Sequence, residues 1–268
     1  MKRKPSVAGY FYPSNPKKLH DMIERLVDSK AEAKKGICII SPHAGYEYSG
    51  RVAGRLFASV QLPEKFIIIG PNHRDVSTNL ALMKTGTWET PLGNVPIDTS
   101  LAESLMKQTD LIVEDDRSHQ KEHSLEVQIP FIQYFKKNIS IVPISIAYYT
   151  PYEELEELGK AVSQAIRKSG QEVLIVASTD MSHYVSQDEA RKKDFLAIEK
   201  ILQLDAKGLY EIVKRERITM CGFQPTTAGI IASKDLNAKK AELIHYQTSG
   251  DVSGNFSEVV GYAGIRIV

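Results

Sequence analysis

The sequence predicts an α/β fold in which a central mixed, largely parallel sheet is flanked by helices. Its short apolar runs are continuous rather than alternating, which is typical of strands that are covered on both faces. Amphipathic stretches lie between these runs, and this alternation favours helices that connect parallel strands. The chain contains no stretch resembling a flexible linker and no internal repeat, so we predict a single domain over residues 1–268.

Six strands are expected from the apolar runs and the turn-forming residues that bound them. The four continuous runs are Gly36–Ser41, Lys65–Gly70, Ser140–Ile146 and Glu172–Ser178. Two more strands are expected between residues 241 and 268, on either side of a turn-rich segment at residues 250–255. These last two form either a hairpin or a pair of edge strands.

Helices are expected where the apolar spacing is amphipathic and a start signal precedes it. Pro151, followed by Glu153 and Glu154, is one such start, because proline and acidic residues are favoured in a first helical turn. The expected helices are Pro16–Ser29, Ser49–Val60, Thr99–Lys107, Glu122–Lys137, Pro151–Ser169, Gln187–Leu204, Ala206–Arg217 and Thr226–Ser233.

Composition limits the class of partner. The 34 basic and 33 acidic residues give a net charge of +1, so no global field exists to recruit nucleic acid or an anionic membrane surface. Two cysteines are too few for a disulfide framework, which favours a reducing compartment. The basic start of the sequence runs into prolines without an apolar segment, and no run is long enough for a membrane span. We therefore expect a cytoplasmic protein.

Polar residues with reactive side chains follow three of the expected strands directly. They include His43 after the first strand, His73 after the second, and Asp180 with His183 after the strand ending at Ser178. Ligands of open α/β sheets bind at the carboxyl ends of the strands. We therefore expect these four side chains to converge on one crevice.

A metal ion is the leading interpretation of the two histidines that follow strands. A single loop histidine is more often a surface or capping residue, but two at equivalent positions favour a shared role. Neutral imidazole is the commonest metal ligand, so His43 and His73 are expected to hold a divalent metal. The alternative is that they act as acid or base.

Asp180 and His183 are candidates for proton transfer. His183 would titrate near neutrality, and Asp180 would orient it or a bound substrate, although a capping aspartate and a solvated histidine are the alternative. Cys221 precedes an expected helix and is either a buried thiol or a thiolate. A thiolate would complete a ligand set of two histidines and one sulfur.

The segment His119–His123 reads H-x-x-E-H, the inverted zinc-peptidase pattern. We disfavour that function, because such a short pattern arises by chance and a helix is expected to begin at Asp116 or Ser118. His123 and Glu126 are expected to line the crevice, or to be purely structural. The sequence also lacks the glycine-rich phosphate-binding motifs and the serine-hydrolase motif G-x-S-x-G.

Six motifs in one order resemble the MEMO family, called AmmeMemoRadiSam system protein B in microbes. They lie at Val7–Pro13, Ser41–Gly50, Gly70–His73, Thr90–Gly93, Glu122–Phe131 and Ser178–His183, so the match spans nearly the whole chain. The resemblance implies a fold similar to class III extradiol dioxygenases, the iron enzymes related to the LigB subunit.

The resemblance also implies the site residues. His43, His73 and Cys221 match the family's metal-binding positions, with Asp180 and His183 beside them as catalytic residues. In the related dioxygenases the third ligand is a carboxylate, and the thiol of Cys221 in its place disfavours the catechol-cleaving cycle. We expect Tyr46, His123 and Glu126 to contact the substrate or support the ligands.

Three functions are consistent with this pattern. The first is a metal-dependent oxidoreductase with Fe(II) or copper, in which His183 is the base and Asp180 orients it. The second is a non-catalytic protein that handles the metal or binds a peptide in the same crevice. The third is a zinc-dependent hydrolase with Asp180 or Glu122 as base. The expected ligand in each case is a small molecule or a peptide.

Overall fold

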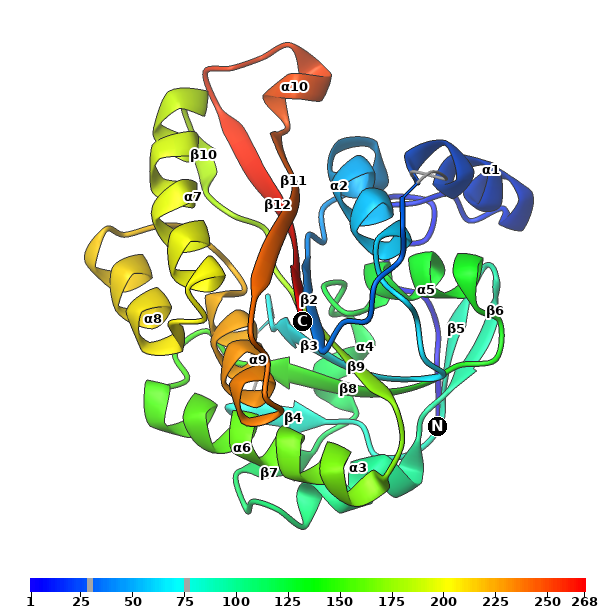
Figure 1. The fold of residues 1–268 in the computed structure, drawn as a ribbon. Coiled ribbons are helices and arrows are strands. Elements are labelled where there is room, and N and C mark those ends of the chain that lie inside the picture. Colours follow the sequence, from blue (N-terminus) through cyan, green and yellow to red (C-terminus); the bar gives the residue numbers. More distant parts are fainter. Residues whose placement is uncertain (28–30, 75–77) are drawn as a thin grey trace.

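The computed structural model describes residues 1–27, 31–74 and 78–268. Within them, a nine-stranded mixed sheet forms the centre of the molecule, with helices packed on both of its faces (Figure 1). The strand order is β10-β12-β2-β9-β3-β8-β4-β7, and β11 pairs with β12. The α/β fold class predicted from the sequence is confirmed.

The four continuous apolar runs form the middle of this sheet. They are strands β2 (Cys38–Ser41), β9 (Val173–Ser178), β3 (Lys65–Pro71) and β8 (Ser140–Ile146). Each is parallel to its neighbour in the order β2-β9-β3-β8. The carboxyl ends of all four strands therefore lie at the same edge of the sheet, which is where the candidate residues were expected.

The last two predicted strands form a hairpin. Strand β11 (Ala241–Thr248) pairs antiparallel with β12 (Val259–Ile267), and the short helix α10 (Gly250–Ser253) lies between them. Strand β12 also pairs antiparallel with β2 and with β10 (His183–Val185). The hairpin alternative is confirmed, but β12 is an interior strand rather than an edge strand.

Six short strands in the described residues, β10 among them, were not predicted, because they have two to four residues and show no readable periodicity. Strands β4 (Leu80–Leu82) and β7 (Ile112–Glu114) extend the main sheet beyond β8. Strands β1 (Lys2–Arg3), β5 (Thr87–Thr90) and β6 (Gly93–Pro96) form a separate small sheet.

The helices bury their apolar faces in two layers, one on each side of the main sheet. One layer contains α3 (Thr99–Met106), α6 (Tyr152–Ser169), α7 (Gln187–Leu202), α8 (Ala206–Arg215) and α9 (Phe223–Asp235). The other contains α1 (Pro16–Leu26), α2 (Tyr46–Ala58) and α5 (Ile129–Phe135). No helix in the described part of the chain is long and apolar enough to cross a membrane.

One predicted helix, Glu122–Lys137, is wrong over its first residues. The chain instead forms the short helix α4 (Arg117–Gln120), a non-helical segment, the 3₁₀ helix η1 (Glu126–Gln128) and then α5. The side chain of Glu122 accepts hydrogen bonds from the backbone N–H groups of His123 and Ser124. These local hydrogen bonds compete with helix formation, because the two N–H groups are satisfied without a helix.

Other helix boundaries differ from the prediction by one to three residues, and three of them lie where the difference matters most. Helix α1 ends at Leu26, and the expected end at residues 28–29 lies outside the described residues. Helices α2 and α9 both begin three residues earlier than predicted, at Tyr46 and Phe223. Both starts bring the helix closer to the carboxyl edge of the sheet, where the candidate side chains lie.

Candidate metal centre

Three histidine side chains meet at the carboxyl edge of the sheet. His43 and His73 each lie two residues beyond the end of a parallel strand, and their ring centroids are 5.2 Å apart. The ring of His123 lies 5.5 Å from that of His43 and 4.7 Å from that of His73. One nitrogen from each ring lies within 4.8 Å of the others, so this group could hold a metal ion.

The hydroxyl of Ser178, the last residue of β9, fixes the tautomer of His43. Its single proton goes to the carbonyl oxygen of Ser124 at 2.7 Å, and it accepts a hydrogen bond from Nε2 of Gln128 at 2.8 Å. The Nδ1 atom of His43, 2.9 Å from the same hydroxyl, must therefore donate to it. The lone pair of His43 is left on Nε2, which is therefore the ring atom that would bind a metal.

Glu122 anchors the other two histidines. Its buried carboxylate accepts backbone N–H groups from His73 at 2.6 Å, His123 at 2.8 Å and Ser124 at 2.7 Å. It also accepts Nδ1–H of His73 at 3.0 Å, and Nδ1 of His123 lies 3.4 Å away. Metal-binding histidines are commonly oriented in this way by a carboxylate on the other ring nitrogen.

The electrostatics keep these groups in the protonation states that metal binding requires. Burial and the nearby His123 and His73 lower the pKa of His43 well below its ordinary value. Burial lowers the pKa of His123 to about 4, although the charge of Glu122 opposes the shift. Burial raises the pKa of Glu122, but hydrogen bonds and charges from His73 and His123 outweigh it and bring the pKa well below its usual range. The imidazoles of His43 and His123 are thus neutral donors near an ionised carboxylate at neutral pH.

Cys221 contacts the same group through His43. Its Sγ atom lies 3.2 Å from Nε2 of His43 and 3.3 Å from the backbone nitrogen of Asp180. Burial and the charge of Asp180 raise the pKa of the thiol well above its ordinary value. Because Nε2 of His43 carries a lone pair, the thiol donates its proton to it, and a metal at that nitrogen would have to displace this hydrogen bond.

Gly222 allows the segment carrying Cys221 to lie directly against the end of β9. Its backbone N–H donates to Oγ1 of Thr179 at 2.9 Å. A Cβ atom at this position would lie 2.6 Å from Cβ of Thr179 and would overlap the carbonyl oxygen of Ser178. The close approach therefore requires glycine.

Asp180 and His183 lie near this group in different environments. Asp180 is buried, and its carboxylate accepts the backbone N–H of His43 at 2.7 Å. Burial raises the pKa of Asp180, and the positive charge available on His183 opposes that shift. His183 lies at the start of β10 and donates Nδ1–H to the carbonyl oxygen of Thr219 at 2.8 Å. Its Nε2 is therefore the ring nitrogen that can accept a proton.

Glu126 and Tyr46 have partners inside the protein. Glu126 is fully buried and accepts hydrogen bonds from Nη1 of Arg3 at 2.8 Å and from the hydroxyl of Tyr12 at 2.5 Å. The hydroxyl of Tyr46 donates to the carbonyl oxygen of Val127 at 2.6 Å, and its ring is buried. For Glu126 this arrangement supports the structural role that the sequence left open.

The H-x-x-E-H pattern does not form a helical zinc-binding pair. Helix α4 ends at Gln120, before Glu122 and His123. His119 is buried, with its ring 5.9 Å from that of Trp88, whereas His123 joins the three-histidine group. The peptidase function disfavoured from the sequence therefore has no support in the geometry.

Sequence reasoning missed two roles, those of His123 as a third imidazole donor and Glu122 as the anchor. Both residues fell inside a helix predicted to begin at Glu122. The polar run before Leu125 carries no apolar periodicity, and this signal could have identified the segment as a loop.

Comparisons with known proteins agree on one family. The family model described as "Memo-like protein" matches residues 3–266. A MEMO1 family protein of Methanopyrus kandleri is 40% identical over 279 residues, covering 99% of this chain and 98% of that protein. Another, from Saccharolobus solfataricus, is 42% identical over 283 residues, covering 99% of both chains.

The solved structure of an uncharacterized protein from Escherichia coli K12 aligns with a TM-score of 0.57 over 85% of this chain and 98% of that one. Its sequence identity is 12%, so it shows likeness of fold alone.

Proposed function

The chain belongs to the Memo-like protein family, and we propose that it is a metal-dependent redox protein with Fe(II) or copper at the histidine group. The observation that supports this proposal most is the convergence of His43, His73 and His123, whose nitrogens lie within 4.8 Å of one another. Hydrogen bonds formed by Nδ1 of His43 and His73 leave the lone pair of each ring on Nε2, and at His43 an ion would displace the thiol proton of Cys221 from that atom.

The donor set fits these ions. Imidazole suits iron, copper and zinc, and the sulfur of Cys221, 3.2 Å from Nε2 of His43, adds a soft donor that favours copper(I) or a redox-active iron. When bound, either ion would supply one-electron redox chemistry. His73 keeps 32% of its side-chain surface exposed, so a ligand can reach the group from solvent.

The surrounding residues have separate roles in this proposal. His43, His73 and His123 hold the ion, and Cys221 is a fourth donor when its proton is displaced. Asp180 is a positioning residue, because its carboxylate holds the backbone of His43 at 2.7 Å. His183 accepts a proton at Nε2 from a small-molecule or peptide ligand, while Thr219 fixes the orientation of its ring.

Anaerobic reconstitution tests the identity of the ion and its redox role. The purified chain is loaded in parallel with Fe(II), Cu(I) or Zn(II), and metal content is measured before and after a cycle of oxidation and reduction. We expect one iron or copper ion per chain that changes oxidation state reversibly and stays bound. Stable binding of zinc alone, or a bound ion that does not cycle, would contradict the redox proposal and favour a hydrolase or a metal carrier.

The variant Cys221→Ser separates the two ligand sets. If the sulfur is a ligand, the variant loses the sulfur-to-metal charge-transfer absorption of the oxidised protein. If the three imidazoles alone hold the ion, both the spectrum and the stoichiometry stay unchanged. Cys38→Ser is the matched control, because this second free cysteine lies at the start of β2 and its Sγ is directed to the carbonyl oxygen of Ile39.

A further inference from the structure

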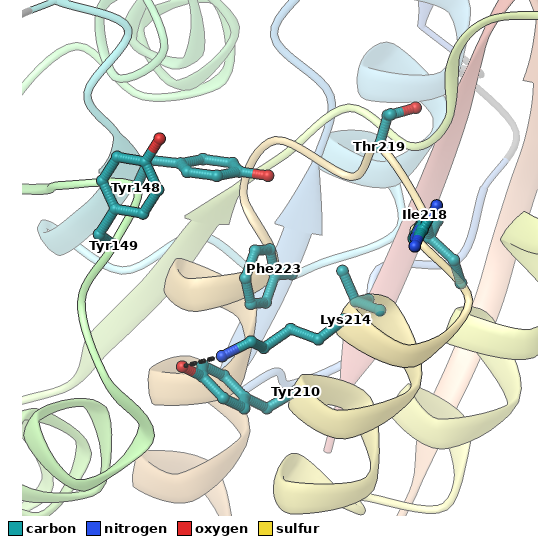
Figure 2. A pocket seen from close by; sticks show the side chains of 9 residues that line it. Tyr148, Tyr149, Tyr210, Lys214, Ile218, Thr219 and Phe223 are labelled. Carbon is teal, nitrogen blue, oxygen red and sulfur yellow. Dashed lines mark hydrogen bonds between the residues drawn. The ribbon is translucent and has the colours of Figure 1, made fainter.

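A cavity with an aromatic wall is lined in part by Thr219, which contacts His183 beside the candidate metal centre. Its volume is about 370 Å³, near the lower end of the range for small-molecule sites. Figure 2 shows the aromatic side chains around it, contributed by the segment after β8, by helix α8 and by the start of α9. They are Tyr148, Tyr149, Tyr210 and Phe223.

The aromatic rings are arranged to receive a flat apolar group. The ring of Phe223 is nearly buried and lies 5.5 Å from that of Tyr210 and 6.3 Å from that of Tyr148, nearly perpendicular to the latter. Tyr149 is 89% exposed and Tyr148 55% exposed. These rings therefore leave apolar surface that a planar ligand would cover.

Two cations border the same cavity. Nζ of Lys214 lies 4.9 Å from the ring centroid of Tyr210, and Arg217 lies three residues further along the chain. In the described residues, neither cation has a carboxylate within 4.0 Å, and no acidic residue lines the cavity. Their charges are therefore available to an anionic ligand.

The backbone of Arg217 has the left-handed conformation that also follows the ends of α7 and α9, at Leu204 and Asn237. Its φ of 50° lies in the left-handed region, and its N–H donates to the carbonyl oxygen of Lys214 where helix α8 ends. Glycine is the residue usually favoured at such a helix end. An arginine here places a cation beside the aromatic wall in a backbone conformation that costs stability.

We infer that this cavity binds a planar aromatic ring carrying an anionic group, such as an aromatic carboxylate. The ring packs against Phe223 and Tyr148, and the anion pairs with Lys214 and Arg217. This inference goes beyond the proposed metal centre and does not depend on a bound ion.

The position of the cavity connects it to the candidate metal centre. Thr219 lines the cavity and also accepts both the backbone N–H and the Nδ1–H of His183. Cys221 follows two residues later, and Phe223 begins helix α9. A ligand in the cavity would therefore lie beside the residue proposed to accept a proton.

Binding of 2-naphthoate to the metal-free chain tests the inference, with 2-naphthamide as the uncharged probe of the same shape. We expect saturable binding of the acid, with affinity about tenfold or more above that of the amide. Lys214→Ala and Arg217→Gly are each expected to weaken binding of the acid about tenfold and leave the amide unchanged. Adenosine monophosphate, run as a competitor, distinguishes a phosphate ester from a carboxylate as the preferred anion.

Two controls separate loss of binding from loss of folding. Arg217→Gly relieves the left-handed backbone, so its thermal midpoint is expected to equal or exceed that of the parent chain. Lys192→Ala removes an exposed cation on α7, away from the cavity, and should leave binding unchanged. Equal affinity for the acid and the amide, unchanged affinity in both cation variants, or no binding of any probe would overturn the inference. Because the probes bind without metal, failure here leaves the proposed metal centre untouched.

Discussion

The carboxylate of Glu122 holds His73 at two points, accepting its backbone N–H at 2.6 Å through Oε2 and its Nδ1–H at 3.0 Å through Oε1. The position of the loop and the orientation of the ring are thus set by one buried side chain. His43 is fixed in the same manner by two groups, Asp180 on its backbone and Ser178 on its ring. The histidine group is therefore preorganised by the protein, so little ordering remains for the ion to impose.

Replacing Glu122 with glutamine should weaken both folding and metal binding. The amide keeps one acceptor oxygen but turns an N–H₂ group toward donors that the carboxylate now satisfies. We expect a loss of about 2–4 kcal/mol in the free energy of unfolding and about 10–100-fold in metal affinity. Urea denaturation and a competitive metal titration measure the two effects.

The matched control for this variant is Glu114→Gln. Glu114 lies on the surface and pairs with Lys84 at 2.8 Å, where solvent screens the interaction. Its change should stay within about 0.5 kcal/mol and leave metal affinity unaltered. Equal effects of the two substitutions would show that Glu122 does not anchor the site.

Adding a methyl group at Gly222 should move Cys221 away from His43. The new Cβ would lie 2.6 Å from Cβ of Thr179, so the segment must shift outward. We expect a stability loss of about 1–3 kcal/mol and a thiol that reacts faster with an alkylating reagent. The control is Gly170→Ala, where φ is 61° and an added Cβ would have no atom within 4 Å. This variant should lose stability through backbone strain alone and leave the reactivity of the Cys221 thiol unchanged.

We expect the buried ion pair between Arg3 and Glu126 to contribute to the free energy of unfolding rather than to metal binding. The guanidinium of Arg3 donates a hydrogen bond to the carboxylate of Glu126 at 2.8 Å. It also donates to the carbonyl oxygens of His119 at 2.6 Å and Glu122 at 2.5 Å, so it connects strand β1 to the segment that contains Glu122. Arg3→Met leaves a buried carboxylate without its cation, and we expect a loss of about 3–5 kcal/mol. Adding Glu126→Gln should recover part of that loss in urea denaturation; strictly additive losses would contradict the pairing.

Acid should destabilise the fold through His119. Burial and the charge of Arg3 lower the pKa of His119 from 6.5 to about 4. Between these values the unfolded chain binds more protons than the folded one, so the free energy of unfolding falls as the pH drops from 6.5 to 4. The contribution is about 3 kcal/mol at most.

The variant His119→Leu isolates this contribution from that of the other buried histidines. His43 and His123 also have lowered pKa values, so the variant keeps part of the acid sensitivity. The difference between the two stability curves should grow across the interval from pH 6.5 to 4. Parallel curves would mean that His119 is not the group titrating there.

The central strands could be predicted from the sequence because each is a continuous apolar run buried on both faces. Strands β2, β3, β8 and β9 all appear within two residues of their predicted bounds. Strands such as β4 and β7 could not, since three residues carry no periodicity and their pairing partners are distant in sequence.

The site was predictable where it depends on topology and obscure where it depends on side-chain packing. His43 and His73 follow parallel strands, so the fold alone brings them to one edge. His123 reaches that edge only because the carboxylate of Glu122 holds its segment out of a helix. Such a local hydrogen-bond network leaves no periodic trace in the sequence.

The most direct test of the metal-centre proposal is an anaerobic titration of Fe(II) and Cu(I) into the parent chain and into His43→Ala, His73→Ala and His123→Ala, with His20→Ala as the control at an exposed histidine. Because His20 lies beside Asp21 and Glu24 in a second, exposed group that could hold a metal, His245→Ala, at a histidine that contacts Arg55, is added as a further control. We predict one tight site in the parent chain and in His245→Ala, and a loss of about 100-fold or more in affinity in His43→Ala, His73→Ala and His123→Ala. Stoichiometric, tight binding that survives all three substitutions would contradict the account.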